Sequence, residues 1–311
     1  VYFILWLPSI IVLKRMFPAL VFSYRNIKIK TIKEMAPFSL GVFYASLTSM
    51  LAIQLDSLII GMALSMSAVT AYTVVSKLFY TAYQYMGMLS GVLQPTSFHA
   101  FANNDRLAIE KLMEKGTKYM NMLYTPIGYM GIIISPMFID LWMGQNYLHY
   151  AGWSQLFMLI FVITAGLGIP LNLVFNSGRT KVPNIMKTFY IIINLLISIL
   201  LINKYGIGGP IIGTLVAEFL FIFTFPYFCK LMNFNWLNYA TIKLKITCIN
   251  IPATIFFYWM QSVTEHTWIN LILLLGIMTF VYFGTFYFMV FTNDEKRDLS
   301  ILASQFKPKI S

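Results

Sequence analysis

The sequence predicts an all-α polytopic membrane protein with nine transmembrane helices. Of its 311 residues, 59% are hydrophobic and only 11% are charged, so the chain is far more apolar than a soluble domain. The apolar residues gather in runs of about 20, the length at which a helix crosses the hydrocarbon core of a bilayer. The basic residues, which give a formal net charge of +11, lie mainly between these runs. We therefore interpret the charge as a record of membrane orientation and expect no nucleic-acid partner.

The nine spans follow one another with short connections. The chain starts without Met and inside an apolar run, so we interpret it as an N-terminally truncated fragment whose first helix is incomplete. The spans are expected near residues 1–13, 36–62, 69–94, 119–139, 153–175, 185–202, 210–229, 246–262 and 269–291.

The distribution of Lys and Arg assigns a direction to every span. Of the 22 basic residues, 20 fall on one side of the membrane if the spans alternate. Lys204 falls on the other side and Lys77 lies inside a span. Because positive residues are enriched in cytoplasmic loops, the side with 20 is predicted to be cytoplasmic, and the C-terminus lies there too.

The second and third spans each carry a charged side chain inside an apolar run. Asp56 lies late in span 36–62 and Lys77 lies in span 69–94, at similar depth on either side of a short turn. An ionised side chain in the bilayer core costs about 2.5 to 3.5 kcal/mol on insertion scales, so such residues face the bundle interior or a water-filled cavity. Two interpretations stay open: the residues form an ion pair that keeps two helices in register, or they face a translocation cavity.

The span that contains Lys77 has a continuous polar face. Its polar residues follow the spacing i, i+3, i+4, i+7 that defines one side of a helix: Thr70, Thr73, Lys77, Tyr80, Thr81 and Gln84. A lipid-facing helix would not carry this face, so we expect it to line a cavity. The candidate substrate-binding residues are Lys77, Asp56, Thr73, Tyr80 and Gln84.

Glu218 is a third charge inside a span, near the middle of 210–229. It is a candidate for binding a coupling ion, together with Asp56, and a protonated, packed glutamic acid is the equal alternative. Small and polar residues also recur on one face of two other spans, where they favour close helix packing. These residues are Asn121, Thr125, Gly128, Gly131 and Ser135 in one span and Asn194 and Ser198 in the other.

No sequence motif indicates enzyme chemistry. The chain contains no Gly-rich phosphate loop, nucleophile elbow or zinc-binding helix. Its three histidines have no metal-binding partner at helical spacing, and the two cysteines are expected to be reduced. We therefore expect neither an enzyme nor a metal or cofactor site.

Several segments of the chain carry, in order, the motifs of one known family of membrane proteins. The Asp late in one helix and the "aY..v.KL" run in the next are matched by Asp56 and by Ala71, Tyr72, Lys77 and Leu78. QPTSFHAFANNDRLAIEKLMEKG resembles the family's cytoplasmic loop, and IDLWMGQNY resembles its "lWlG..Y" signature. The segment from NSGRTKVP to GTLVAEF is similar to the family's eleventh and twelfth helices. With these motifs in this order, the chain resembles the polysaccharide flippases, the Wzx-like family of the multidrug, oligosaccharidyl-lipid and polysaccharide exporter superfamily.

The resemblance implies a transporter of two bundles and about fourteen helices, of which this chain holds the last spans. On that mapping, residues 1–13 are the remnant of the first bundle's last helix, and 14–35 are a basic cytoplasmic loop between the bundles. Residues 36–230 form the second six-helix bundle. Residues 231–311 form two additional C-terminal helices and a cytoplasmic tail.

The resemblance also implies a function. The transporter would turn a polyprenyl-diphosphate-linked oligosaccharide, of the O-antigen or capsule type, from the cytoplasmic to the outer leaflet of the inner (plasma) membrane by alternating access. Its expected partners are the lipid-linked oligosaccharide, membrane lipids and a coupling ion, either a proton or sodium. Lys77 would meet the diphosphate, while Asp56 and Glu218 would bind the coupling ion or sugar hydroxyls. A multidrug or metabolite exporter of the same superfamily and a membrane-embedded glycan polymerase remain alternatives.

Overall fold

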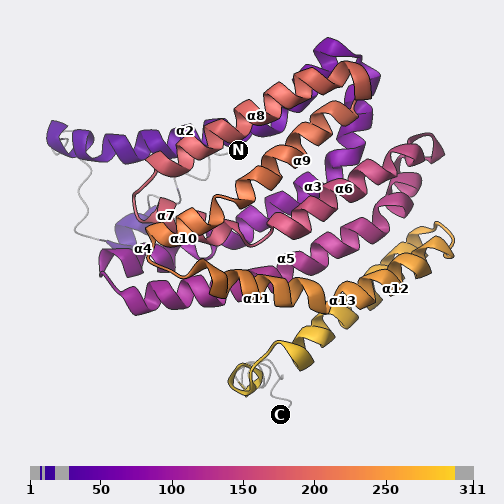
Figure 1. The fold of residues 1–311 in the computed structure, drawn as a ribbon. Coiled ribbons are helices and arrows are strands. Elements are labelled where there is room, and N and C mark those ends of the chain that lie inside the picture. The colour runs from indigo at the N-terminus through magenta and orange to yellow at the C-terminus, as the bar shows by residue number, and fades with distance from the viewer. Residues whose placement is uncertain (1–7, 9–10, 18–27, 298–311) are drawn as a thin grey trace. The chain divides into compact units, whose positions relative to one another are not determined.

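The computed structural model describes residues 8, 11–17 and 28–297. In this part of the chain all regular secondary structure is helical (Figure 1), which confirms the predicted fold class. The helices are α2 (Ile29–Ala63), α3 (Met66–Gly91), α4 (Gln94–Ala102), α5 (Arg106–Met143), the 3-10 helix η2 (Gln145–Tyr150), α6 (Ala151–Thr164), α7 (Gly168–Asn176), α8 (Lys181–Tyr205), α9 (Gly208–Ile222), α10 (Phe225–Leu231), α11 (Trp236–Ile249), α12 (Ile251–Ser262) and α13 (Trp268–Met289).

The chain divides into two compact units, Val1–Phe43 and Tyr44–Ser311, and the boundary falls inside α2. The predicted first span and the C-terminal tail lie largely outside the described residues. In the first unit, α2 already begins at Ile29, so the segment predicted as the loop 14–35 is partly helical. The second unit contains the rest of α2 and all the other helices named above.

Seven helical segments of the described chain are long and apolar enough to cross a membrane. They are Ile29–Ala63, Arg106–Met143, Gln145–Thr164, Lys181–Tyr205, Gly208–Leu231, Trp236–Ser262 and Trp268–Met289. The predicted count of nine is therefore not confirmed. The predicted span 69–94 forms α3, but this helix is not among the seven apolar segments.

Three of the predicted spans are broken helices. Between α6 and α7 the chain turns at Ala165 and at Gly166, whose φ of +76° lies in the left-handed region that favours glycine. The junctions of α9 with α10 and of α11 with α12 each have a proline at the start of the second helix, Pro226 and Pro252. Proline lacks the amide hydrogen that would continue the preceding helix, and it is well tolerated in the first turn of the next.

The second unit is built around α5, which packs against α3, α6, α11, α12 and α13. Glycines allow its close contact with α6: a Cβ atom at Gly128 would lie 2.3 Å from Val162, and one at Gly131 would lie 2.3 Å from Met158. Helices α8 and α9 approach in the same way, because a Cβ at Gly213 would lie 2.4 Å from the Ser198 hydroxyl. The predicted packing role of these small-residue faces is confirmed.

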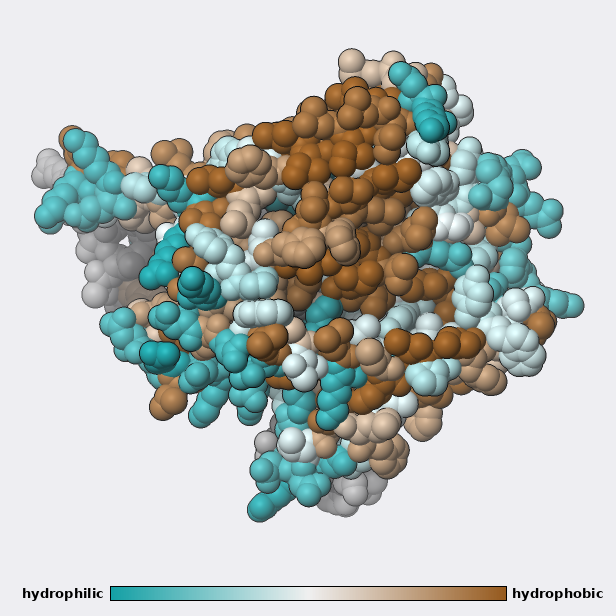
Figure 2. Space-filling view, viewed as in Figure 1, coloured by the Kyte–Doolittle hydropathy of each residue, from teal (hydrophilic) through white to brown (hydrophobic). Residues whose placement is uncertain are grey.

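The surface of the second unit carries a broad hydrophobic face over α8 and α9, drawn in brown in Figure 2. Large apolar side chains are exposed along the length of α8: Ile185, Phe189, Ile192, Leu196 and Leu200. An exposed apolar face of this extent is typical of a surface that contacts lipid or another protein. This agrees with a helix that crosses a membrane.

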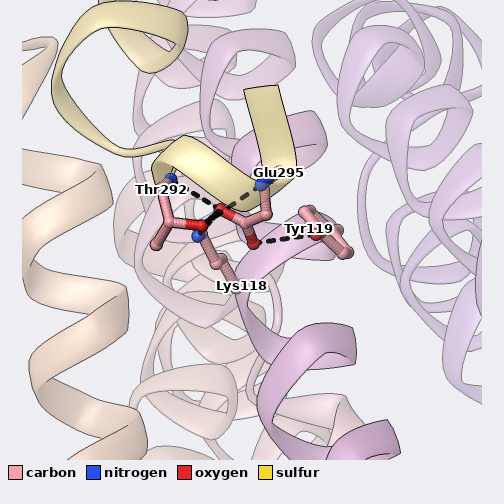
Figure 3. Close-up of polar contacts among 4 residues, drawn as sticks. All are labelled: Lys118, Tyr119, Thr292 and Glu295. Carbon is pink, nitrogen blue, oxygen red and sulfur yellow. Dashed lines mark hydrogen bonds and ion pairs between the residues drawn. The ribbon is translucent and has the colours of Figure 1, made fainter. Parts of the chain in front are cut away.

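The segment that follows α13 is attached to α5 through the carboxylate of Glu295 (Figure 3). One oxygen accepts hydrogen bonds from Lys118 Nζ at 2.5 Å and from the Thr292 backbone amide at 2.8 Å. The other accepts from the Tyr119 hydroxyl at 2.8 Å. Burial by itself raises the pKa of Glu295, but these hydrogen bonds and the Lys118 charge outweigh it and lower that pKa to about 2.

Candidate functional site

Asp56 is completely buried, and its carboxylate joins three helices. One oxygen, Oδ2, accepts a hydrogen bond of 2.7 Å from the hydroxyl of Tyr72 on α3 and one of 2.9 Å from the hydroxyl of Thr214 on α9. Asn194 of α8 supports this arrangement, because its amide donates to the Thr214 hydroxyl at 2.8 Å. The second carboxylate oxygen, Oδ1, is buried without a hydrogen-bond partner. A buried carboxylate oxygen left in this state can accept a proton or coordinate a cation.

Lys77 lies apart from Asp56. Its side chain is exposed, and the described residues contain no ion pair between the two. The structure therefore does not contain the ion pair between Asp56 and Lys77 that the first of the two interpretations expects. Asp56 is held instead by hydroxyl groups of Tyr72 and Thr214.

The predicted polar face of α3 divides into two parts. Thr73 and Gln84 are exposed like Lys77, whereas Tyr80 is half-buried and its hydroxyl lies 3.1 Å from that of Tyr72. Thr73 donates its hydroxyl to the carbonyl of Val69, one turn earlier in the same helix, at 2.8 Å. Most of this face therefore lies on the surface of the second unit.

Glu218 lies one helical turn after Thr214 on α9 and is almost fully buried. Its Oε1 accepts hydrogen bonds from the hydroxyls of Tyr190 at 3.1 Å and of Tyr83 at 3.5 Å. The ammonium of Lys187 on α8 lies 4.5 Å from the centre of the Tyr190 ring, a cation–π contact. The carboxylate is thus surrounded by polar groups from two other helices, α3 and α8.

Two cavities of the second unit meet beside Glu218. The larger has a volume of about 420 Å³ and the smaller about 250 Å³. Both are lined by Ser49, Tyr83, Lys187 and Glu218. The smaller cavity is also lined by the predicted residues Tyr80 and Gln84 and by Thr214. Asp56 does not line this cavity, but it is hydrogen-bonded to Thr214, which does.

The two cavities are lined by acidic, basic and aromatic side chains, a combination that can bind charged or polar ligands. Neither is lined by Thr73 or Lys77, so the predicted site residues do not form one cluster. Within residues 8, 11–17 and 28–297, no group of three or more His, Cys, Asp and Glu side chains is placed to hold a metal ion.

Sequence reasoning missed part of this site. Lys187 is one of the 20 basic residues counted on the predicted cytoplasmic side, at the start of span 185–202. It lies in the second turn of α8 and lines both cavities. Nothing in the sequence around Tyr83 or Tyr190 indicates that their hydroxyls contact Glu218. Tyr83 follows Tyr80 by three residues, so the helical spacing of the polar face of α3 was the one available indication.

The comparisons with known proteins agree with this fold. Residues 8–152 match the model of a family described as polysaccharide biosynthesis proteins. The predicted family resemblance is confirmed. A membrane protein of Methanocaldococcus jannaschii with no characterised function is 26% identical over 286 residues, which cover 90% of this chain and 55% of that protein. The chain thus spans about half the length of this curated relative.

One solved structure shares the fold. It is titled the lipid II flippase MurJ in an inward closed conformation. The match has a TM-score of 0.60 at 15% sequence identity and covers 82% of this chain and 55% of that one. Together with the seven apolar helical segments, these similarities identify a multi-pass membrane protein.

Proposed function

We propose that the chain contributes a helix bundle to a transporter that flips a polyprenyl-diphosphate-linked oligosaccharide from the cytoplasmic to the outer leaflet of the plasma membrane by alternating access. The support is the match to polysaccharide biosynthesis proteins and the fold shared with a lipid II flippase. The C-terminus lies in the cytoplasm, as the distribution of basic residues predicts. The proposed substrates are lipid-linked repeat units of the O-antigen or capsule type.

The exposed face of α3 is the observation that carries the proposal. Lys77 lies near the middle of a 26-residue helix and is exposed, with Thr73 and Gln84 exposed on either side of it. An ammonium facing hydrocarbon at this depth is costly, so the face meets water or a polar ligand. A sugar diphosphate also needs a polar path, because its charge cannot enter hydrocarbon without partners. Lys77 is therefore proposed to contact the diphosphate.

Asp56 and Glu218 are the proposed sites for the coupling ion. Asp56 has one buried oxygen without a partner, and its other oxygen accepts from the hydroxyl of Thr214, which in turn accepts from the amide of Asn194. Glu218 faces the two cavities and lies one turn from Thr214. A proton or a sodium ion bound here would alter contacts among α2, α3, α8 and α9, which is the kind of change that alternating access requires.

Complementation tests this function. The full-length gene that contains this chain is supplied to a bacterium lacking its O-antigen or capsule flippase, and surface glycan is measured. Glycan is expected to return, to fall at least about tenfold with Lys77→Ala, a loss of about 1.4 kcal/mol, and to persist with Lys204→Ala. Lys204 is the matched control, because it is an exposed lysine at the far end of α8. If the protein reaches normal levels in the membrane but restores surface glycan in no host, whatever its repeat unit, the flippase proposal is wrong.

A multidrug or metabolite exporter is the second candidate, and the larger cavity favours it. Organic cations bind to carboxylates and aromatic rings, and this cavity presents Glu218, Tyr83, Phe175 and Phe221. Efflux of ethidium from the same cells separates the two functions. Efflux that depends on Glu218 and leaves surface glycan unchanged would support the exporter.

A further inference from the structure

The break between α6 and α7 leaves backbone carbonyls at the end of α6 without the amides of a following turn. The chain departs from helical geometry at Ala165, whose ψ is 137°, and turns at Gly166. Ala165 is fully buried, so water does not satisfy these carbonyls at the surface. The residues on either side of the break, Thr164, Leu167 and Gly168, line the larger cavity.

The side chain of Lys243 fills this break from α11. Its ammonium donates hydrogen bonds to the carbonyl oxygens of Val162 at 3.0 Å and Ala165 at 2.5 Å, and to Asn121 Oδ1 at 3.2 Å. An ammonium has three donors, and here all three have an acceptor. Lys243 falls between the predicted spans 210–229 and 246–262, among the basic residues counted on the cytoplasmic side, but only 9% of the residue is exposed.

The acceptors are arranged for a positive charge. The C-terminal end of a helix carries partial negative charge, which favours a cation beside the carbonyls of α6. The amide nitrogen of Asn121 donates to the Thr117 carbonyl at 2.6 Å, and this bond directs Oδ1 toward the ammonium. Gly166 permits the arrangement, because a Cβ there would lie 2.4 Å from the Asn121 amide.

We infer that the carbonyl oxygens of Val162 and Ala165 and the side-chain oxygen of Asn121 form a cation site, and that the ammonium of Lys243 is its resident, covalently attached cation. Lys243 acts as a positioning residue: it fixes the break between α6 and α7 and with it one wall of the larger cavity. Simple packing of the lysine stem is the competing account. The two differ in whether the positive charge is required.

Three variants of the chain, purified in detergent, separate the two accounts. Lys243→Ala removes both charge and volume, whereas Lys243→Met keeps most of the volume and removes the charge. Lys245→Ala is the matched control, because Lys245 is an exposed lysine on the same helix. We expect both Lys243 variants to lower Tm by at least about 5 °C and the control to leave it unchanged.

Chemical rescue identifies the site as a cation site. Methylammonium can enter the space left in Lys243→Ala and donate to the three oxygens, whereas tetramethylammonium has no N–H group. We expect methylammonium, and not tetramethylammonium, to restore Tm and to slow amide exchange at residues 165–169 in this variant. A Lys243→Met protein as stable as the wild type, or an absence of specific rescue, would overturn the inference.

A further pair of variants covers the case in which Lys243→Ala does not fold. Asn121→Asp places a carboxylate beside the ammonium but removes the donor to the Thr117 carbonyl, a loss that is the same with or without Lys243. It is therefore expected to be less damaging while Lys243 is present. The same change combined with Lys243→Met buries an unpaired charge and is expected to abolish folding. Equal damage from Asn121→Asp in both backgrounds would contradict the inference.

Discussion

The hydroxyl of Thr214 on α9 donates a 2.9 Å hydrogen bond to the carboxylate of Asp56 on α2, across 158 residues of sequence. The contact joins the buried carboxylate to the helix that also carries Glu218, one turn further on. The two proposed coupling-ion residues are therefore both connected to α9, Asp56 through Thr214 and Glu218 directly.

Removing the Thr214 hydroxyl tests this connection. Thr214→Val keeps the shape of the side chain but takes one hydrogen bond from Asp56 and the acceptor from Asn194. We expect a loss of about 1 to 3 kcal/mol in the free energy of unfolding. Thr241→Val is the control, because that exposed threonine bonds only within its own helix. Thermal unfolding in detergent measures both, and equal stability of the two variants would show that the contact contributes nothing.

The close approach of α8 and α9 depends on Gly213. Gly213→Ala would place a Cβ 2.4 Å from the Ser198 hydroxyl and 2.8 Å from the Asn194 carbonyl oxygen, so the helices must separate. Overpacking of this kind costs about 1 to 3 kcal/mol. Gly276→Ala on α13 has no atom within 4 Å of the new methyl group and should gain about 0.5 to 1 kcal/mol from helix propensity. The unfolding curve of Gly213→Ala is expected to shift toward lower stability and that of Gly276→Ala toward higher stability. A destabilised Gly276→Ala would contradict the open space seen beside Gly276.

The attachment of the C-terminal segment at Glu295 should depend on pH. Because the folded pKa is lowered from 4.5 to about 2, its contribution is complete above the unfolded value and is lost as pH falls from 4.5 toward 2. Glu295→Gln should therefore be less stable than the wild type at pH 7, and the difference should shrink on acidification in this window. Glu34→Gln, which removes an exposed 4.0 Å pair with Lys30, should show no such dependence. A difference for Glu295→Gln that is constant with pH would contradict the assignment.

The sequence predicted the features that depend on local pattern. The burial of Asp56 and the packing of Gly128 and Gly131 follow from residue type and spacing along one segment. The partners of Asp56 did not, because Tyr72 and Thr214 meet it only when three helices come together.

The two lysines inside the second unit were missed for a different reason. The backbones of Lys187 and Lys243 lie close to the predicted cytoplasmic ends of their spans. The positive-inside rule counts such lysines as cytoplasmic, but it does not say which way their side chains point. Long side chains reach either the interface or the protein interior from the same backbone position. Thr73 gives no independent indication of a cavity, because its hydroxyl donates to the Val69 carbonyl in the same helix. The exposed polar face of α3 is therefore defined by Lys77 and Gln84.

We propose that the face of α3 around Lys77 lines a water-filled path in the transporter. Thiol labelling in membranes measures this directly, using the full-length protein with Cys229 and Cys248 replaced by alanine. Lys77→Cys is compared with Ile192→Cys, an exposed position near the middle of α8 on the hydrophobic face. We expect a membrane-impermeant maleimide to label Lys77→Cys readily and to leave Ile192→Cys unlabelled. Equal protection of both cysteines from the reagent would place Lys77 outside any aqueous path and contradict the claim.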